Sequence, residues 1–399
     1  MKIVIDLTAF NPEYGGGVGT YTKGLIPELL STKNFNDIHI ICVEKNAKWI
    51  EKNFDSASSI IVVKSKHKIL SKLIFGFSFH FFPISKLLKF GQSLKWKEAI
   101  DRIDGFFDIT YVPTTYINFP LKKSKIVVSL HDCQEMRYPH FFSHRQLRYR
   151  KINISNTLKE ANVIQTSSKF IESEIRTFFP KYTENLNFEK IPEGVDLKQF
   201  SYRHFDSKES VVRILFPASF HPHKNHRLLF DSMKLINTNI EFEISITGLE
   251  NDNYHEVQKI ALDLKLNNLK FLGYLSREEL ILKYQKSDIV ISCSLYESSS
   301  LPILEGVACG CLVLASDIQS HQEMSTDFNI LLFQSDNAIS LSEHLLELLE
   351  LVHFGHQKSI QRENLRAIMS RSWTKIAHNY WDLFSGVFQQ DQTVRNEIS

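Results

Sequence analysis

Short apolar runs recur along the whole chain, and several of them are followed by segments with the apolar spacing of a helix. In the first half we predict buried strands at Lys2–Leu7, Ile38–Val43, Ile60–Val63, Ile109–Val112, Ile126–Leu130 and Val163–Thr166. In the second half the same pattern predicts strands at Arg213–Pro217, Glu241–Thr247, Leu269–Leu272, Ile289–Cys293, Leu312–Ala315 and Ile330–Phe333. Alternating strands and helices favour doubly wound parallel sheets, so the expected fold class is α/β.

The two series of strands indicate two domains. A chain of 399 residues is too long for one ordinary core. Residues 201–210 (SYRHFDSKES) are polar and have no apolar period, which makes them the expected linker. We therefore predict a Rossmann-like domain over residues 1–200 and a second one over residues 201–376. A last helix-like segment carries aromatic side chains from Trp373 to Phe388.

The composition is that of an ordinary globular protein, with 43% hydrophobic and 23% charged residues. A formal charge of only +2 gives no general attraction for nucleic acid, and none is expected as a partner. The five cysteines are scattered, so we expect buried thiols in a reducing cytosol. The first residues, MKIVIDL, lead straight into a strand and leave no room for a signal peptide. A cytoplasmic protein is expected.

Basic and aromatic residues alternate between Lys64 and Lys97. The apolar stretch Ile69–Ile84 inside this segment is interrupted by Lys72 and Pro83 and is too short to span a bilayer. The favoured interpretation is a pair of core helices with solvated lysines. The alternative is contact of residues 64–97 with an anionic membrane surface, which would place the protein at the inner face of the plasma membrane.

Two open α/β domains that face each other place ligand sites at the carboxyl ends of their strands, in the cleft between them. The first unusual segment there is Tyr14–Leu25 (YGGGVGTYTKGL), which follows the first predicted strand. Gly16 and Gly17 allow positive φ and close approach to a ligand, and a helix is predicted to begin near Val18 with amides that attract an anion. The spacing is not that of a dinucleotide-binding GxGxxG motif, and a flexible turn is the alternative.

A histidine marks the end of the strand Ile126–Leu130 in the first predicted domain. His131 comes directly after this strand, so its side chain points into the cleft if the strand ends there. As an uncharged donor or acceptor it could hold a sugar hydroxyl, and the adjacent Asp132 could fix its tautomer or position. A histidine buried in the core is the competing interpretation.

The third segment, FPASFHPHKNH (Phe216–His226), follows the first strand of the second predicted domain. Lys224 is the residue best suited to neutralise a diphosphate, because its ammonium group offsets charge that develops on a leaving phosphate. Three histidines of this segment also raise the question of zinc: His221, His223 and His226. A cap or stacking role is favoured over zinc, because no cysteine or acid nearby completes a tetrahedral set.

The fourth segment, YESSSLPILE (Tyr296–Glu305), follows the predicted strand Ile289–Cys293. Pro302 suits the first turn of a helix, and Ser300 suits its N-cap. The amides of Ser299, Ser300 and Leu301 would then lie at a helix N-terminus, which attracts anions.

The two acids of this segment lie on either side of that helix start. Glu305, about one turn into the helix, could accept hydrogen bonds from vicinal hydroxyls such as those of a ribose. Glu297, in the loop before the helix, would reach the other side of the phosphate. A phosphate-sized helix end separates the acids, so a hydrolytic carboxylate pair is disfavoured. A capped helix with surface acids is the alternative.

Glu297 and Glu305, with Leu301-Pro302 between them and GVACGCLVLASD (Gly306–Asp317) directly after the second acid, resemble the E-x7-E motif of the retaining glycosyltransferases of family four, the glycosyl transferases group one. Other segments are similar to this family in the same order along the chain: the glycine-rich segment near Gly16, LHDCQEMRYPHFFS (Leu130–Ser143), IPEGVD (Ile191–Asp196), HKNH (His223–His226) and LGYLSREEL (Leu272–Leu280). The resemblance covers nearly the whole chain, and the joint order of the motifs is specific.

The resemblance implies a GT-B fold. Residues 1–200 would form an acceptor-binding domain, with the C-terminal helix 377–399 packing back on it, and residues 201–376 a nucleotide-sugar domain. Catalytic roles would fall to Glu297 at the donor sugar, Lys224 at the diphosphate and His131 at the far hydroxyls of the sugar. The implied donor-binding residues are Glu305 at the ribose, the backbone of Ser299, Ser300 and Leu301, the glycines Gly16 and Gly17, and Ser219 near Lys224.

Two features of the sequence depart from the family pattern. Ser298-Ser299-Ser300 stand where many relatives have Gly-x-Gly, which narrows the freedom of φ but keeps the amides and adds hydroxyls. Ala218 stands where many relatives have an arginine before the phosphate-binding lysine, so Lys224 would act alone or with a neighbouring histidine.

The resemblance implies transfer of a hexose from a nucleoside-diphosphate sugar to a hydroxyl, with retention of configuration. GDP-mannose is the expected donor, and a glycan or lipid-linked glycan of a cell-surface polysaccharide such as O-antigen is the expected acceptor. No cofactor and no metal ion are expected, because Lys224 and the helix end would offset the phosphate charge. The alternatives are a nucleotide-sugar epimerase of the same fold and a non-catalytic relative that binds a glycan or a nucleotide.

Overall fold

The computed structural model describes residues 1–13, 16–32, 37–63, 98–203, 211–251 and 253–398. The segment 64–97, for which membrane contact was considered, lies outside the described residues, as does most of the expected linker. Two compact units divide the chain. The first comprises Met1–Ser167, Ile171–Ile191 and Ile376–Ser399, and the second Ser168–Phe170 and Pro192–Lys375. Within the described part, no helix is both long and apolar enough to cross a membrane.

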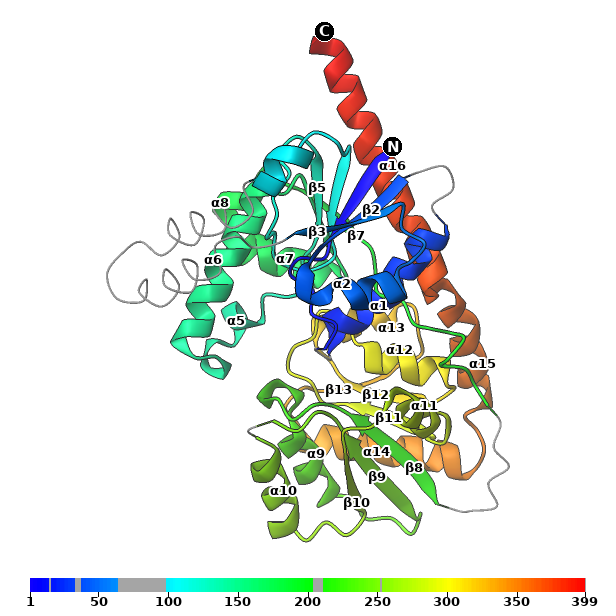
Figure 1. Ribbon diagram of the computed structural model, residues 1–399. Helices are drawn as coiled ribbons and strands as arrows, with labels where there is room; N and C mark the ends of the chain where they lie inside the picture. The colour runs from blue at the N-terminus through cyan, green and yellow to red at the C-terminus, as the bar shows by residue number, and fades with distance from the viewer. Residues whose placement is uncertain (14–15, 33–36, 64–97, 204–210, 252, 399) are drawn as a thin grey trace. The chain divides into compact units, whose positions relative to one another are not determined.

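The first unit is built on a seven-stranded parallel sheet of order β3-β2-β1-β4-β5-β6-β7 (Figure 1). Its strands are β1 (Lys2–Asp6), β2 (Asp37–Val43), β3 (Ser59–Val63), β4 (Ile109–Val112), β5 (Lys125–Ser129), β6 (Val163–Thr166) and β7 (Asn187–Lys190). Its helices are α1 (Gly17–Ser31), α2 (Glu44–Asn53), α5 (Gln134–Arg137), α6 (His144–Glu160), α7 (Lys169–Phe178, of which the first two residues belong to the second unit) and α8 (Pro180–Thr183).

The second unit is built on a six-stranded parallel sheet of order β10-β9-β8-β11-β12-β13. Its strands are β8 (Val212–Pro217), β9 (Phe242–Thr247), β10 (Leu269–Gly273), β11 (Ile289–Ser292), β12 (Leu312–Ser316) and β13 (Leu331–Phe333). Its helices are α9 (His226–Met233), α10 (Tyr254–Asp263), α11 (Arg277–Gln285), α12 (Leu301–Ala308), α13 (Gln319–Ser325), α14 (Ala338–His353) and α15 (Lys358–Ala367). The predicted α/β class with doubly wound parallel sheets is therefore confirmed.

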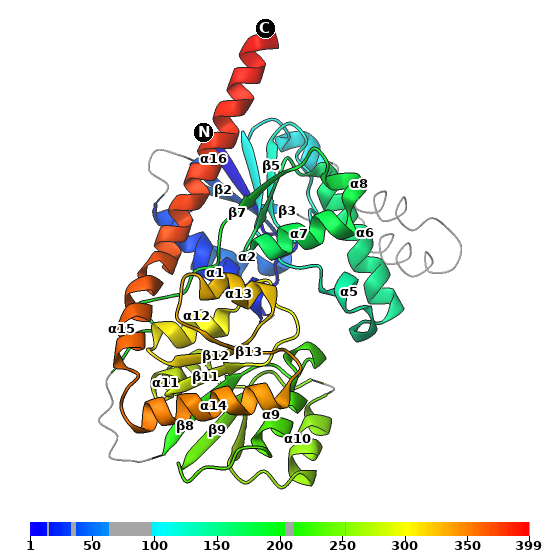
Figure 2. The same ribbon diagram turned by 180° about the vertical axis from the view of Figure 1, so that it is seen from behind.

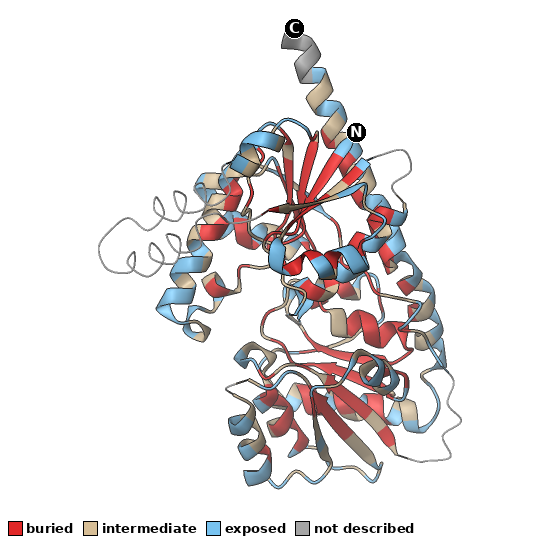
Figure 3. Cartoon of the chain, viewed as in Figure 1, coloured by how far each residue is buried: buried red, intermediate tan, exposed pale blue. Residues whose placement is uncertain are grey.

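The central strands of the second sheet are buried on both faces, which is why they read as continuous apolar runs (Figure 3). In β11, Ile289 and Ile291 face the cluster that contains α9 and α14, whereas Val290 faces the cluster that contains α12. Figure 2 shows α14 lying across the first of these faces. Because successive side chains of a strand point to opposite faces, one apolar strand serves both layers.

The strand that the sequence did not predict is β7, with the sequence Asn187-Phe188-Glu189-Lys190. It pairs with β6 at the edge of the first sheet, and three of its four side chains are exposed. An edge strand is held by backbone hydrogen bonds and needs no apolar run, so periodicity gives no signal for it.

The last helix, α16 (Trp373–Ile398), belongs to the first unit from Ile376 onward. Its Tyr380 hydroxyl is hydrogen-bonded to the hydroxyls of Tyr21 and Ser129, the latter at 3.2 Å. Trp381 Nε1 donates to Thr32 Oγ1 at 3.0 Å. The buried hydroxyls satisfy one another inside the apolar layer, so α16 is fixed to the sheet by polar and aromatic contacts together. All five cysteines are buried thiols, as the sequence predicts.

Gly248, directly after β9, touches the backbone of the loop that leads to Lys224. A Cβ atom at this position would lie 2.4 Å from the carbonyl oxygen of Ala218 and 2.6 Å from Ser219 Cα. These are backbone atoms, so the overlap is relieved only if the loop moves. We predict that Gly248→Ala lowers the free energy of unfolding by about 1–3 kcal/mol, measured by thermal or urea unfolding.

Gly386→Ala is the matched control for this substitution. Gly386 lies within α16, and among the described residues a Cβ atom added there would have no neighbour within 4 Å beyond the backbone of its own helix. Alanine at this position should therefore preserve or slightly raise stability. Equal melting temperatures for Gly248→Ala and the parent protein would contradict the tight packing of this loop.

Candidate functional site

The strand order of the second sheet changes direction between β8 and β11, which are neighbours in the sheet but not in the sequence. In doubly wound sheets, ligands bind at the carboxyl ends of the strands at such a switch point. The loop after β8 carries Lys224, and the loop after β11 carries Glu297. The two loops also meet through their backbones, since the amide of Leu295 donates to the carbonyl of His223 at 2.8 Å.

Lys224 and Glu297 form an ion pair at this switch point. The ammonium group contacts Glu297 Oε1, and the Ser294 hydroxyl donates to the same oxygen at 2.7 Å. Only 16% of the lysine side chain and 14% of the glutamate side chain are exposed. Burial alone would raise the pKa of Glu297, but the Lys224 ammonium, together with His223 and Ser294, holds this pKa below its ordinary value. Glu297 is therefore an anion at neutral pH.

Helix α12 begins at Leu301, four residues after Glu297, and Pro302 occupies its first turn, as the sequence predicts. Ser300 occupies the N-cap position, and its backbone carbonyl accepts from the amides of Ile303 and Leu304 at 3.0 and 3.2 Å. Its side chain makes no capping hydrogen bond among the described residues, so the helix start is not closed by a hydroxyl. The first amides of a helix have no intrahelical acceptor and carry its positive dipole end.

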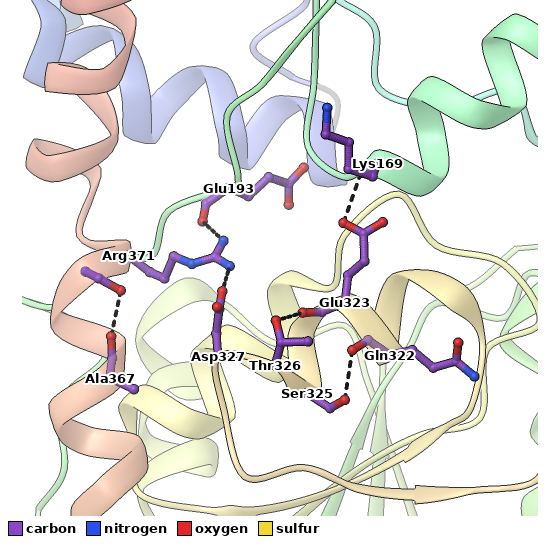
Figure 4. Close-up of polar contacts among 10 residues, drawn as sticks. Lys169, Glu193, Gln322, Glu323, Ser325, Thr326, Asp327, Ala367 and Arg371 are labelled. Atoms are coloured by element: carbon purple, nitrogen blue, oxygen red, sulfur yellow. Dashed lines mark hydrogen bonds and ion pairs between the residues drawn. The ribbon is translucent and has the colours of Figure 1, made fainter.

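A hydrogen bond holds the first residue of the serine triplet that precedes α12. The Ser168 hydroxyl donates to the backbone carbonyl of Ser298 at 2.8 Å. The amides of the next two residues, Lys169 and Phe170, donate to the Glu323 carboxylate at 2.9 and 2.6 Å. These hydrogen bonds anchor the segment Ser168–Phe170 on α13 (Figure 4). Ser298 is therefore held by a side-chain hydroxyl from the segment before α7.

Glu305 lies one turn into α12 and is buried beneath the helix start. The guanidinium of Arg277 contacts Glu305 Oε1 at 3.1 Å and lies 4.4 Å above the centre of the Phe200 ring. Burial raises the pKa of Glu305, and Arg277 and the Tyr284 hydroxyl only partly offset this effect. The helix packs directly on the sheet, because a Cβ atom at Gly306 would lie 2.8 Å from Val290 Cγ2.

Sequence reasoning did not assign roles to Arg277 or Glu193. Both lie in segments that resemble the family, LGYLSREEL and IPEGVD, but spacing alone gives no partner for either residue. The structure places Arg277 on Glu305, whereas Glu193 is buried and its carbonyl accepts from Arg371 Nη1 at 3.5 Å. Arg277 therefore contacts a residue that the sequence had selected.

The three histidines near Lys224 do not point to one centre. His226 is buried and stacked on Phe220, with ring centres 4.8 Å apart, and burial lowers its pKa to about 3. The rings of His221 and His223 stack on each other instead. Among the residues that the structure describes, no group of three or more His, Cys, Asp or Glu side chains could hold a metal ion. Ser219 is half-buried, and its backbone carbonyl accepts from the amide of His221 at 2.8 Å.

The remaining predicted site residues belong to the first unit. His131 is 7% exposed, and its Nε2 atom lies 2.8 Å from the carbonyl oxygen of Pro113. That carbonyl can only accept, so Nε2 carries the proton and Nδ1 is the acceptor. Burial lowers the pKa of His131, which keeps the ring neutral. The expectation that Asp132 orients this ring is wrong, because Asp132 forms an ion pair with Arg150.

Helix α1 begins within the glycine-rich segment, one residue before the predicted start at Val18. Gly16 precedes the helix with φ of 103°, a value that favours glycine, and Gly17 is its first residue. A Cβ atom at either position would have no neighbour within 4 Å among the described atoms. Gly16 is therefore required by the turn itself, whereas packing does not require Gly17. The neighbouring Gly15 lies outside the described residues.

Solved structures share this architecture over nearly the whole chain. A glycosyltransferase from Rickettsia africae superposes with a TM-score of 0.69 at 18% identity, covering 97% of this chain and 98% of that one. Anabaena HepE in complex with UDP and glucose superposes with a TM-score of 0.67 at 17% identity, covering 97% of this chain and 100% of that one. The fold is GT-B, as the motifs implied.

The sequence of the second unit matches a known family. Residues 199–366 match the family model of the glycosyl transferases group 1. O-antigen chain mannosyltransferase B of Escherichia coli is 24% identical over 253 residues, which span 61% of this chain and 65% of that protein. O-antigen chain mannosyltransferase RfbU of Salmonella typhimurium is 24% identical over 321 residues, 78% of this chain and 82% of that protein. The resemblance drawn from the motifs is confirmed.

We expect the Lys224–Glu297 ion pair to contribute to the free energy of unfolding. Lys224→Met leaves the Glu297 carboxylate buried without a cation, which we expect to lower the free energy of unfolding by about 3–5 kcal/mol at neutral pH. In the parent protein the lowered pKa of Glu297 contributes stability above its unfolded pKa, and this contribution is lost as the pH falls through the folded pKa. In Lys224→Met, stability should instead fall as the pH rises.

A double variant tests the pairing itself. Lys224→Met with Glu297→Gln should recover most of the lost stability, because no buried charge remains. Lys270→Met is the control, since Lys270 pairs with Glu243 at the surface and 60% of its side chain is exposed, so its loss should cost less than about 1 kcal/mol. Equal free energies of unfolding for Lys224→Met and Lys270→Met, measured in urea at pH values from acid to neutral, would contradict the predicted contribution of the Lys224–Glu297 pair to stability.

Proposed function

We propose that this protein is a retaining hexosyltransferase that uses a nucleoside-diphosphate sugar. One observation carries the proposal: a partly buried lysine and a partly buried glutamate meet at the switch point of the second sheet, beside the N-terminus of α12. A diphosphate needs a cation and free amides, and a hexose needs a fixed carboxylate that accepts from its hydroxyls. The match of residues 199–366 to the family model of the glycosyl transferases group 1 supports this assignment.

The proposed roles follow from the contacts in the second unit. The amides of Ser299, Ser300 and Leu301 bind the diphosphate, and Lys224 leaves Glu297 to neutralise it. Glu297, freed from the ammonium group, accepts from hydroxyls of the transferred sugar. Glu305 accepts from the ribose hydroxyls, with Arg277 holding the carboxylate in place. The predicted roles of Ser219, and of His131, Gly16 and Gly17 in the first unit, stay predictions.

The proposed reaction exchanges one bond at the anomeric carbon for another on the same face of the sugar. The bond from this carbon to the leaving phosphate oxygen breaks, and the bond to the acceptor oxygen forms. The acceptor proton passes to the leaving phosphate, so no separate protein base is needed. Lys224 and the α12 amides stabilise the charge that develops on that phosphate, an electrostatic effect worth most in a buried site.

We propose mannose as the sugar and GDP-mannose as the donor. The support comes from relatives: two are O-antigen chain mannosyltransferases, and a Drosophila tRNA-queuosine alpha-mannosyltransferase is 28% identical over 142 residues. HepE, which shares the fold, was crystallised with UDP-glucose, so UDP-glucose is the donor to compare with GDP-mannose. The proposed acceptor is a glycan or lipid-linked glycan of a cell-surface polysaccharide, reached from the cytoplasmic face of the membrane.

Release of nucleoside diphosphate tests the function directly. The protein is incubated with GDP-mannose, UDP-glucose or a dTDP-sugar, with and without a lipid-linked glycan acceptor, and products are analysed by mass spectrometry. We expect acceptor-dependent release of GDP and a glycan heavier by one hexose, undiminished by EDTA because Lys224 and α12 supply the positive charge. A new sugar isomer without transfer would indicate an epimerase, and nucleotide binding without turnover would indicate a binding protein.

Substitutions of Glu305 and Lys224 should impair different steps, nucleotide binding and turnover. Glu305→Ala should weaken nucleotide binding by about 10- to 150-fold, the range for a lost hydrogen bond to a charged group. Lys224→Ala should instead lower kcat by about 10²- to 10³-fold, because its charge acts mainly on the leaving phosphate. Glu278→Ala, an exposed acid on α11, is the control for Glu305→Ala. Parental kinetics in both site variants would refute the assignment.

A further inference from the structure

We propose that His321 is a positioning residue that sets Glu297 in place to receive the transferred sugar. This inference rests on the proposed function, since it assumes that Glu297 accepts from hydroxyls of that sugar. His321 lies on α13 and is absent from the mechanism above, yet its side chain is fully buried. A short chain of hydrogen bonds connects its ring to the Glu297 carboxylate through two serines.

The chain of hydrogen bonds begins at Ser316, the last residue of β12. His321 Nδ1 lies 2.9 Å from the Ser316 carbonyl oxygen and 3.3 Å from the Ser316 hydroxyl oxygen. The same hydroxyl donates to the backbone carbonyl of Ser294 at 2.6 Å. The Ser294 hydroxyl in turn donates at 2.7 Å to Glu297 Oε1, the oxygen that also contacts Lys224. Both serines are buried, so water does not compete for these contacts.

The two serines fix the position of the ring proton of His321. The Ser294 carbonyl can only accept, so the single proton of the Ser316 hydroxyl points to it. Both oxygens of Ser316 therefore accept from the histidine, which places the ring proton on Nδ1. Burial lowers the pKa of His321 to about 4, so the ring is neutral at pH 7. His321 is thus a neutral donor with one defined tautomer.

The other ring nitrogen of His321 contributes no such contact. Nε2 is buried and has no hydrogen-bond partner among the residues that the structure describes. An unpaired acceptor in a buried ring costs free energy, which an apolar side chain of similar size would avoid. The favourable contribution of this histidine therefore lies in the contact of Nδ1 with Ser316.

Ser294 is held from three directions, one of which depends on His321. Its hydroxyl donates to Glu297, and its carbonyl accepts from Ser316. The amide of the next residue, Leu295, donates to the carbonyl of His223 at 2.8 Å. Because β11 and β12 are neighbours in the sheet, the contact with Ser316 ties the loop after β11 to the end of β12. The histidine holds that end of β12 from α13.

The hydrogen bond from Ser294 matters most once the donor is bound. In the proposed mechanism the diphosphate draws Lys224 away from Glu297. The Ser294 hydroxyl is then the described hydrogen-bond donor that remains on the Glu297 carboxylate. Since a carboxylate must be fixed to accept from particular sugar hydroxyls, its position in the bound state depends on Ser294 and, through Ser316, on His321.

Two amide substitutions of His321 separate its hydrogen bond from its volume. Asparagine places an amide nitrogen near the position of Nδ1, whereas glutamine places one near that of Nε2 and is closer to histidine in size. His321→Asn should therefore retain most of the parental kcat/KM for hexose transfer from GDP-mannose or UDP-glucose. His321→Gln and His321→Leu should lower kcat/KM by about 10- to 100-fold, the effect of a catalytic group displaced by about 1 Å.

Binding of the nucleotide alone shows whether the effect is confined to Glu297. GDP and UDP carry no hexose, so their dissociation constants, measured by isothermal titration calorimetry, should stay close to the parental values in all three His321 variants. Loss of nucleotide affinity in parallel with kcat/KM would mean that His321 supports the whole site, and this result would overturn the proposal.

A second substitution breaks the chain of hydrogen bonds at its middle. Ser316→Ala removes the hydroxyl that donates to Ser294 and should lower kcat/KM as His321→Leu does. The double variant should be no worse than either single variant, because both remove the same support. His344→Leu is the matched control: its Nδ1 lies 2.7 Å from the carbonyl oxygen of Ser340 within α14, so this variant should keep the parental kinetics.

The outcomes distinguish this inference from the proposed function. If His321→Gln or His321→Leu were as active as the parent, or if His321→Asn were less active than His321→Gln, the role of His321 would be wrong and the proposed function would stand. If the parent protein bound neither nucleotide and transferred no hexose from either donor, the proposed function would fail and this inference with it.

Discussion

The partly buried ion pair between Lys224 and Glu297 is the contact on which the proposed site depends. It joins the loops that follow β8 and β11, the two neighbouring strands at which the order of the second sheet changes direction. A buried charge pair is costly to form and costly to break, so it contributes less to net stability than to fixing which groups face each other. In the free protein it also keeps the lysine at the place where a phosphate is expected. A ligand with two phosphate charges can compete for that lysine, whereas a neutral sugar cannot.

At the start of α12 this chain has serines where many relatives have glycines. Here three serines stand before the helix, and the Ser168 hydroxyl restricts the first of them by donating to the Ser298 carbonyl. The helix itself cannot shift along the sheet, because Gly306 lies directly against Val290. Glu305, one turn further, is held by Arg277. The serine triplet and Glu305, which are proposed to touch the donor, are thus supported by residues that do not touch it.

Most of the fold could be predicted from the sequence because most of its strands are buried apolar runs. Every predicted strand from Lys2–Leu7 to Ile330–Phe333 is present, with ends that differ by one residue or less. The exception, β7, is an edge strand with exposed polar side chains, so its sequence has no apolar pattern from which a strand could be predicted. Long-range polar pairing was harder to predict. Lys224 and Glu297 were chosen for their separate chemistry, but nothing in their spacing shows that they meet.

The errors and omissions in the site have the same physical origin. Asp132 was expected to orient His131 because it is adjacent in sequence, but neighbouring residues after a strand point in different directions. The structure gives His131 a backbone carbonyl and gives Asp132 an arginine from α6. Glu193 and Arg277 were missed because their partners are more than twenty residues away along the chain. Such pairs depend on tertiary packing, which a single sequence does not reveal.

The most direct test of the central claim is a crystal structure of the full chain with bound GDP or UDP. The account predicts that the terminal phosphate lies within hydrogen-bonding distance of the amides of Ser299 to Leu301, and that the Lys224 ammonium has moved from Glu297 to a phosphate oxygen. A nucleotide bound elsewhere, with the Lys224–Glu297 pair unchanged, would contradict it.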